Sequence, residues 1–142
     1  MPGVRLGQLL LALDATLVTL VQAPRGLDLP VGTAALIDAD DVRLGLASSV
    51  ETADAFFLLG LSDDEALRWL DRQARTRSPI AVFAKRPAPA LVAQAAKSGT
   101  AVVAVDPQAR WERLYRLVNH VLDHHGQARG DSGTDLFALA QS

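Results

Sequence analysis

Five residues with ligand-binding chemistry directly follow short apolar runs in the sequence. AFFLL is followed by Gly60 and Ser62, IAVFA by Lys85 and Arg86, and TAVVAV by Asp106. Glycine lets a ligand approach the backbone, a serine at a helix start offers donors, and lysine or arginine favours an acidic or carbonyl-rich molecule. These residue types predict a small polar ligand-binding cleft in which no residue is assigned to catalysis.

The three apolar runs alternate with amphipathic segments, and this rhythm predicts how the five residues are positioned. AFFLLG precedes SDDEALRWLDRQARTR, IAVFAK precedes PALVAQAAKSG, and TAVVAVD precedes PQARWERLYRLVNHVLDHH. Continuous apolar runs are typical of strands covered on both faces, and strand-helix alternation favours parallel crossovers. Ligands bind outside the carboxyl ends of such strands, so we expect Gly60, Ser62, Lys85, Arg86 and Asp106 to converge at one sheet edge.

Each residue also has a purely structural interpretation. Ser62 and Glu65 form a capping box at a helix start, and Lys85 and Arg86 can be solvated loop residues. Aspartates after strands are common turn formers. The cleft is therefore a hypothesis that rests on all five residues together.

The rest of the pattern fits one α/β domain with a mainly parallel sheet of about five strands and flanking helices. Leucines at helical spacing predict a short opening helix that ends near Asp14. Strands are expected at 16–21 and about 33–37, and these two could pair as neighbours. Pro107 fits the first turn of the last helix, which should end at Gly126.

Composition excludes several classes of protein. The 142 residues are 49% hydrophobic and 21% charged, which suits one domain with a sizeable core. A net charge of -2 gives this chain no reason to hold a nucleic-acid backbone, and the lack of cysteine excludes disulfides and thiolate chemistry. No apolar run reaches membrane-spanning length, so we expect a soluble cytoplasmic domain without a membrane partner.

The common catalytic and nucleotide-binding motifs are missing. The sequence has no G-x-G-x-x-G, no G-x-x-x-x-G-K-[ST] and no G-x-S-x-G. His120 and His124 lie four residues apart, but no third ligand is evident, so neither a metal site nor a cofactor is predicted.

One chemical alternative stays open. The cluster of Asp38, Asp40 and Asp41, together with Lys85, would suit a phosphoreceiver-like or small enzyme domain. A receiver needs its acceptor aspartate at the end of the central strand, where this chain has Gly60.

The order of these elements resembles a known family. An LGQLLLALD helix, a strand, the turn GLDLPV, a second strand with an acidic dipeptide, and FFLLG before repeated strand-helix units resemble the N-terminal domain of PucR-type bacterial transcriptional regulators. The resemblance runs from about Val4 to His125. It implies a regulatory domain that binds a small-molecule effector or a partner domain and biases a C-terminal helix-turn-helix, outside this chain, that binds DNA.

The chain departs from the family at one place. The usual pattern has a Gly-Glu-Leu segment with a Thr-Thr-Gly turn after the second strand, and this chain has LASSVETADAFFLLG. No ligand-contacting role is therefore carried over to that region.

The resemblance also divides the chain. Residues 1–126 correspond to the sensory domain, and 127–142 to a linker and the start of a following GAF-like domain, because DLFALA resembles the opening helix of such a domain. We expect residues beyond about Gln127 to be mobile or to pack on a neighbouring molecule.

Self-association is also expected. Regulators that read paired half-sites usually act as dimers, so we predict a homodimer, with Tyr115 and the FFLLG neighbourhood as candidate anchors. A purely oligomerising module with an empty cleft is the remaining alternative.

Overall fold

A five-stranded sheet forms the centre of the domain. The computed structural model describes residues 4–13, 15–40 and 53–130, the last six of them by backbone alone. The strand order is β2-β7-β6-β5-β4, formed by β2 (Val18–Gln22), β4 (Ala34–Asp38), β5 (Ala55–Leu59), β6 (Ala81–Lys85) and β7 (Ala101–Val105). Neighbours from β4 to β7 are parallel, and only β2 runs antiparallel, against β7. The predicted α/β fold with a mainly parallel sheet is confirmed.

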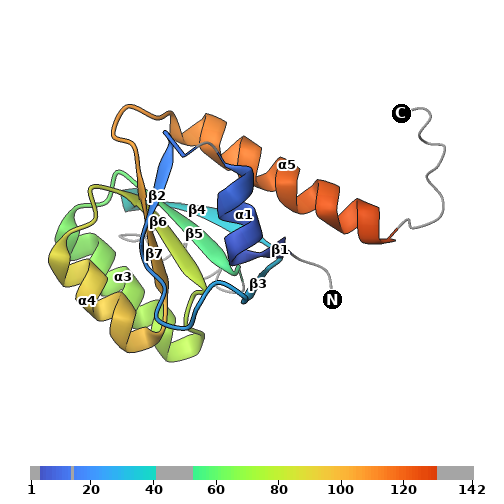
Figure 1. Ribbon diagram of the computed structural model, residues 1–142. Coiled ribbons are helices and arrows are strands. Elements are labelled where there is room, and N and C mark those ends of the chain that lie inside the picture. Colours follow the sequence, from blue (N-terminus) through green and yellow to red (C-terminus); the bar gives the residue numbers. More distant parts are fainter. Residues whose placement is uncertain (1–3, 14, 41–52, 131–142) are drawn as a thin grey trace.

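Helices cover both faces of this sheet (Figure 1). On one face lie α1 (Leu6–Ala12) and α5 (Trp111–Gly130), and on the other α3 (Asp63–Thr76) and α4 (Pro89–Ser98). Successive strand residues point to opposite faces, so Phe57 enters the core beneath α5 while Phe56 packs against Trp69 of α3. A small antiparallel ribbon of β1 (Val4–Arg5) and β3 (Pro30–Val31) lies beside α1.

Local sequence signals explain where the two helices next to the site begin. The Ser62 hydroxyl accepts a hydrogen bond from the Glu65 amide at 3.2 Å, and the Glu65 carboxylate accepts one from the Ser62 amide at 2.9 Å. This capping box is the one predicted from the sequence. Helix α4 begins with Pro89 and ends at Gly99, whose φ of 75° favours glycine.

Four details of the predicted fold are wrong. The first two predicted strands do not pair with each other, because β2 and β4 form opposite edges of the sheet. Pro107 lies in a turn before α5, which begins at Trp111, and α5 continues through Gly126 to Gly130. The strand expected at 16–21 begins at Val18.

Some predictions fall outside the described residues. The linker and following helix were expected in 127–142, of which only 127–130 are described, as helix. Asp14 and Asp41 also lie outside. Across the described ranges, no helix combines the length and the apolar character needed to cross a membrane.

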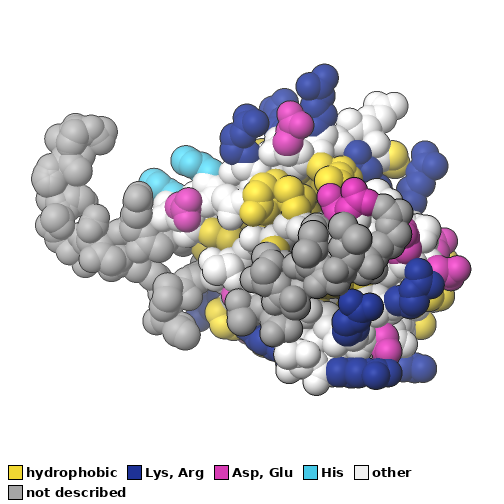
Figure 2. Space-filling model, turned by 180° about the vertical axis from the view of Figure 1, so that it is seen from behind, with side chains coloured by type: hydrophobic (Ala, Val, Ile, Leu, Met, Phe, Trp, Pro, Cys, Tyr) yellow, Lys and Arg dark blue, Asp and Glu magenta, His cyan; other side chains and the backbone are white. Residues whose placement is uncertain are grey.

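Helix α5 extends beyond the sheet (Figure 1), and histidine side chains lie exposed on that part (Figure 2). The rings of His120 and His124 are nearly parallel, with centroids 5.9 Å apart. Among the described residues no three His, Cys, Asp or Glu side chains gather as they would around a metal ion. The pair is therefore a feature of the helix surface, away from the strand ends.

Candidate functional site

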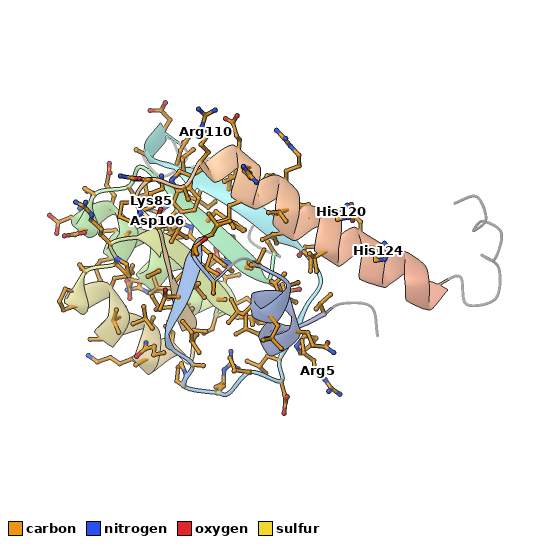
Figure 3. The ribbon with its side chains drawn as sticks, turned by 45° about the horizontal axis from the view of Figure 1, so that its top comes forward. Arg5, Lys85, Asp106, Arg110, His120 and His124 are labelled. Carbon is orange, nitrogen blue, oxygen red and sulfur yellow. The ribbon has the colours of Figure 1, made fainter. Side chains whose placement is uncertain are left out.

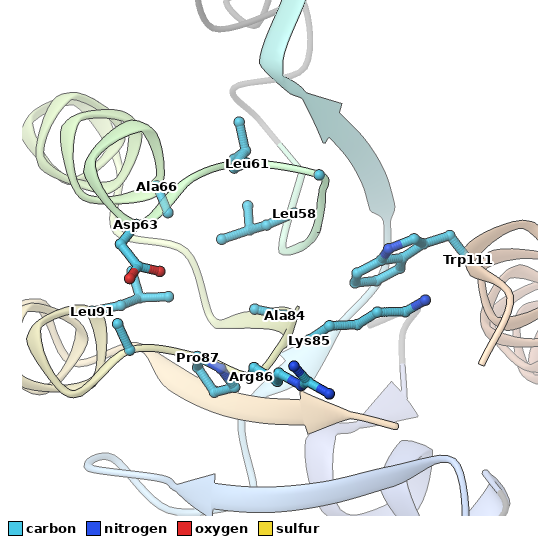
Figure 4. A pocket seen from close by; sticks show the side chains of 12 residues that line it. Leu58, Leu61, Asp63, Ala66, Ala84, Lys85, Arg86, Pro87, Leu91 and Trp111 are labelled. Atoms are coloured by element: carbon cyan, nitrogen blue, oxygen red, sulfur yellow. The ribbon is translucent and has the colours of Figure 1, made fainter. Parts of the chain in front are cut away.

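The predicted site residues lie at the carboxyl ends of the parallel strands. Lys85 closes β6, and Asp106 follows β7 at the same end of the sheet (Figure 3). A pocket of about 180 Å³ opens there between the ends of β5 and β6 and the first turns of α3 and α4. Its rim carries Asp63, Lys85 and Arg86, while Leu58, Ala84 and the Trp111 indole contribute apolar wall (Figure 4).

A second pocket adjoins the first. It has a volume of about 280 Å³ and is lined by Thr16, Leu17, Thr19, Asp106 and again by Arg86, among others. Arg86 therefore borders both pockets and connects them along the sheet edge.

The structure brings four of the five predicted residues to these pockets. Gly60, Lys85 and Arg86 line the first, and Arg86 and Asp106 line the second. Ser62 lines neither, because its hydroxyl is used to cap α3.

Trp111 was missed by the sequence reasoning as a pocket residue, because it was assigned to the apolar stripe of the last helix. Its place at the start of that helix, directly after the turn that follows β7, was the available signal.

Gly60 and Arg86 occupy equivalent places on neighbouring strands. Leu58 of β5 pairs with Ala84 of β6. Gly60 lies two residues after Leu58, and Arg86 lies two residues after Ala84. Both have positive φ, 68° for Gly60 and 51° for Arg86, and Arg86 is the one non-glycine residue in the described ranges with this conformation. A left-handed backbone costs an ordinary residue about 1–2 kcal/mol. The following Pro87 also favours an extended conformation at Arg86.

The two cations at the rim are held differently. The Lys85 Nζ lies 5.5 Å from the centroid of the Trp111 ring, a cation–π contact that keeps the half-buried lysine against the pocket wall. Trp111 in turn makes an edge contact with Phe57, at 6.0 Å between centroids. Arg86 is exposed, and within the described part of the chain it forms no ion pair.

Two aspartates that follow strands, Asp38 and Asp106, lie apart along the sheet edge. Asp38 ends β4 and Asp106 follows β7, so β5 and β6 lie between them. Three strand spacings separate the two by roughly 14 Å, too far for both carboxylates to bind one cation at its usual oxygen distances. The strand ends therefore offer two cations, Lys85 and Arg86, with one carboxylate beside each pocket, from Asp63 and Asp106.

Comparisons with family models, curated proteins and solved structures gave no match for this chain. What the site can do therefore rests on its own residues. Two cations beside an apolar wall, with the Asp63 carboxylate on the same rim, suit a small molecule with a carboxylate or several carbonyl oxygens and a hydrogen-bond donor.

The predicted dimer anchors pack within the domain. The Tyr115 ring packs on Phe57 with centroids 5.6 Å apart, and its hydroxyl donates to the Ala34 carbonyl at 3.4 Å. Phe56 and Phe57 are fully buried. The apolar side of α5 thus packs on the domain's own sheet, while Tyr115 stays partly exposed, and the homodimer stays a prediction.

The role of Ser62 leads to a first prediction. Ser62→Ala should lower the free energy of unfolding by about 1 kcal/mol, because the Glu65 amide loses its capping partner, and should leave ligand affinity unchanged. Urea denaturation and calorimetric titration measure the two quantities. Ser78→Ala, outside any helix cap, is the control. An affinity loss in Ser62→Ala greater than in Ser78→Ala would show that the hydroxyl contacts the ligand.

Proposed function

We propose that this domain is the ligand-sensing or regulatory domain of a PucR-type bacterial transcriptional regulator. It binds a small acidic or carbonyl-rich metabolite at the pocket between the ends of β5 and β6. Binding biases a helix-turn-helix module outside residues 1–142. Sensing requires only that the ligand bind one state of the protein better than another, so the proposed function needs no reaction in this domain.

The observation that carries this proposal is the backbone of Arg86. Its φ of 51° suits glycine, and the equivalent position on the neighbouring strand is in fact Gly60. Costly conformations of this kind cluster at ligand sites, where the side chain they present has a use. Here the conformation puts a guanidinium between two pockets, where a bound anion would give the charge a partner.

The pocket limits the ligand to a small one. Sites for drug-sized molecules have volumes of roughly 300–1,000 Å³, and the pocket next to Lys85 measures about 180 Å³. Leu58, Ala84 and Trp111 suit an apolar portion of the ligand, while the rim cations suit its anionic or carbonyl portion. A small organic acid satisfies both.

Replacing Arg86 with glycine tests this proposal. Relief of the positive φ outweighs the greater freedom of glycine in the unfolded chain, so Arg86→Gly should raise the free energy of unfolding by about 0.5–1 kcal/mol. The same change should reduce the rise in melting temperature given by a ligand, since it removes one of the two rim cations. The measurement is a thermal-shift screen of small carboxylates, nucleobases and nucleotides on the wild-type chain and the variant.

Arg68→Ala, which removes an exposed cation from α3, is the matched control and should keep the full ligand shift. A lower stability in Arg86→Gly would mean that the positive φ of Arg86 is not a costly conformation in this fold. If a ligand shifts the wild-type chain and Arg86→Gly equally, the pocket is in the wrong place.

A further inference from the structure

Opposite charges share the first pocket without pairing. Asp63, the first residue of α3, lines it together with Lys85 and Arg86 from the end of β6. In Figure 4 the Asp63 carboxylate lies on the α3 side, and Lys85 lies across the pocket beside Trp111. Within the described residues none of the three charged side chains forms an ion pair. The pocket therefore has a negative and a positive side that stay apart.

The local structure keeps these charges separate. The aspartate side chain is short, and its backbone is held at the start of α3 by the Ser62–Glu65 capping box. Lys85 contacts the Trp111 ring, and Arg86 follows β6 with a left-handed backbone. One molecule that carries a charge of each sign can satisfy both sides of such a pocket with charge-assisted hydrogen bonds.

We propose that the ligand of this pocket is a compact amino acid, with its carboxylate against Lys85 and Arg86 and its ammonium group against Asp63. This inference rests on the proposed function and narrows its ligand class. A simple organic acid leaves Asp63 without a partner. A dicarboxylate or a phosphate ester would bring further negative charge near Asp63, and like charges that meet at a binding site lower affinity.

The volume and the apolar wall limit the side chain of the amino acid. The pocket, of about 180 Å³, is smaller than the sites of drug-sized ligands. Leu58, Ala84 and Leu91 line it and are buried, so they provide aliphatic contact surface. A small aliphatic side chain, as in alanine or valine, fits this combination better than a long or charged one.

Two aspartates at the start of α3 allow ligand binding to be separated from a purely structural role. Asp63 and Asp64 are both exposed and both lie in the first turn, where a carboxylate stabilises the helix dipole. Of the two, Asp63 alone lines the pocket. Asp63→Asn and Asp64→Asn should therefore lower the melting temperature by similar small amounts, while ligand binding should change in Asp63→Asn alone.

Calorimetric titration with matched compounds tests the inference. The probes are L-alanine, β-alanine and L-valine, together with propionate and isovalerate, which lack the ammonium group. In the wild-type chain we expect the best amino acid to bind about tenfold more tightly than its matched carboxylate, because it makes one further hydrogen bond to a charged group. Asp63→Asn should remove this preference and leave the carboxylate bound at least as tightly, since a like charge is lost. Asp64→Asn should keep the preference.

The outcomes distinguish this inference from the proposed function. If the carboxylates bind and lose affinity in Arg86→Gly, but the amino acids bind no more tightly, the amino-acid ligand is wrong and the proposed function stands. A preference for the ammonium group that survives Asp63→Asn, or that falls equally in Asp64→Asn, also overturns the inference. If none of these compounds binds, the amino-acid ligand is wrong, and the proposed function then depends on the wider screen of small anions.

Discussion

Replacing Lys85 and Arg86 together with alanine is expected to weaken the binding of an anionic ligand by about 5- to 150-fold. The loss corresponds to about 1–3 kcal/mol, the contribution of hydrogen bonds to charged groups. Folding should be nearly unaffected, within about 1 kcal/mol, since Arg86 is exposed and Lys85 loses only a cation–π contact with Trp111. Calorimetric titration and urea denaturation measure the two effects separately.

A charge-matched control isolates the local contribution. Arg68→Ala with Arg72→Ala removes two exposed cations from α3, so it changes the net charge equally without touching the pockets. We expect this variant to bind the ligand within about twofold of the wild-type chain at physiological salt, where distant charges are screened. Equal losses in both double variants would mean that the ligand responds to net charge and not to the rim of the pocket.

Phe57→Ala should produce the largest loss of stability, about 3–5 kcal/mol, as expected for a phenylalanine removed from a packed core. Phe57 is fully buried and stacks on Phe83, with centroids 4.7 Å apart and ring planes 8° from parallel. Trp111 and Tyr115 of α5 meet it edge-on, so its loss also loosens that helix. The free energy of unfolding of a typical domain is about 5–15 kcal/mol, so this loss is a large fraction of it. The urea midpoint of Phe57→Ala should therefore be much lower than that of the wild-type chain.

Phe57→Leu and Leu20→Ala are the controls for this measurement. Leucine keeps most of the buried volume and should recover much of the loss, while Leu20 is partly exposed on the edge strand and its truncation should cost far less. A loss below about 1 kcal/mol in Phe57→Ala would mean that α5 does not pack on β5 as described.

The strands and helices that carry the site were predictable because their signals are local. Continuous apolar runs identify β5, β6 and β7, and the Ser62–Glu65 spacing identifies the start of α3. Sheet order was not predictable, because Val18 pairs with Val105 across most of the chain and nothing in VTLVQ names that partner. The two-residue strands β1 and β3 are too short to produce a pattern.

The position of the site was predictable from the sheet topology, but the conformation of its residues was not. The carboxyl ends of parallel strands share an edge, and this placed Gly60, Lys85, Arg86 and Asp106 near the two pockets. The positive φ of Arg86 had no sequence signal, since a following proline indicates the opposite. Trp111 packs against the core as predicted, and only its second place, in the pocket wall, was missed. Ser62 was predicted both as a cap and as a ligand-binding residue, and the structure shows the cap.

The most direct test is an NMR titration of the labelled chain with the compound that gives the largest thermal shift. We predict that the largest amide changes map to Gly60, Lys85, Arg86 and Asp106, together with the indole N–H of Trp111. Changes concentrated in the turn at residues 24–30 or along the exposed side of α5, with these five positions unchanged, would contradict a ligand site at the strand ends.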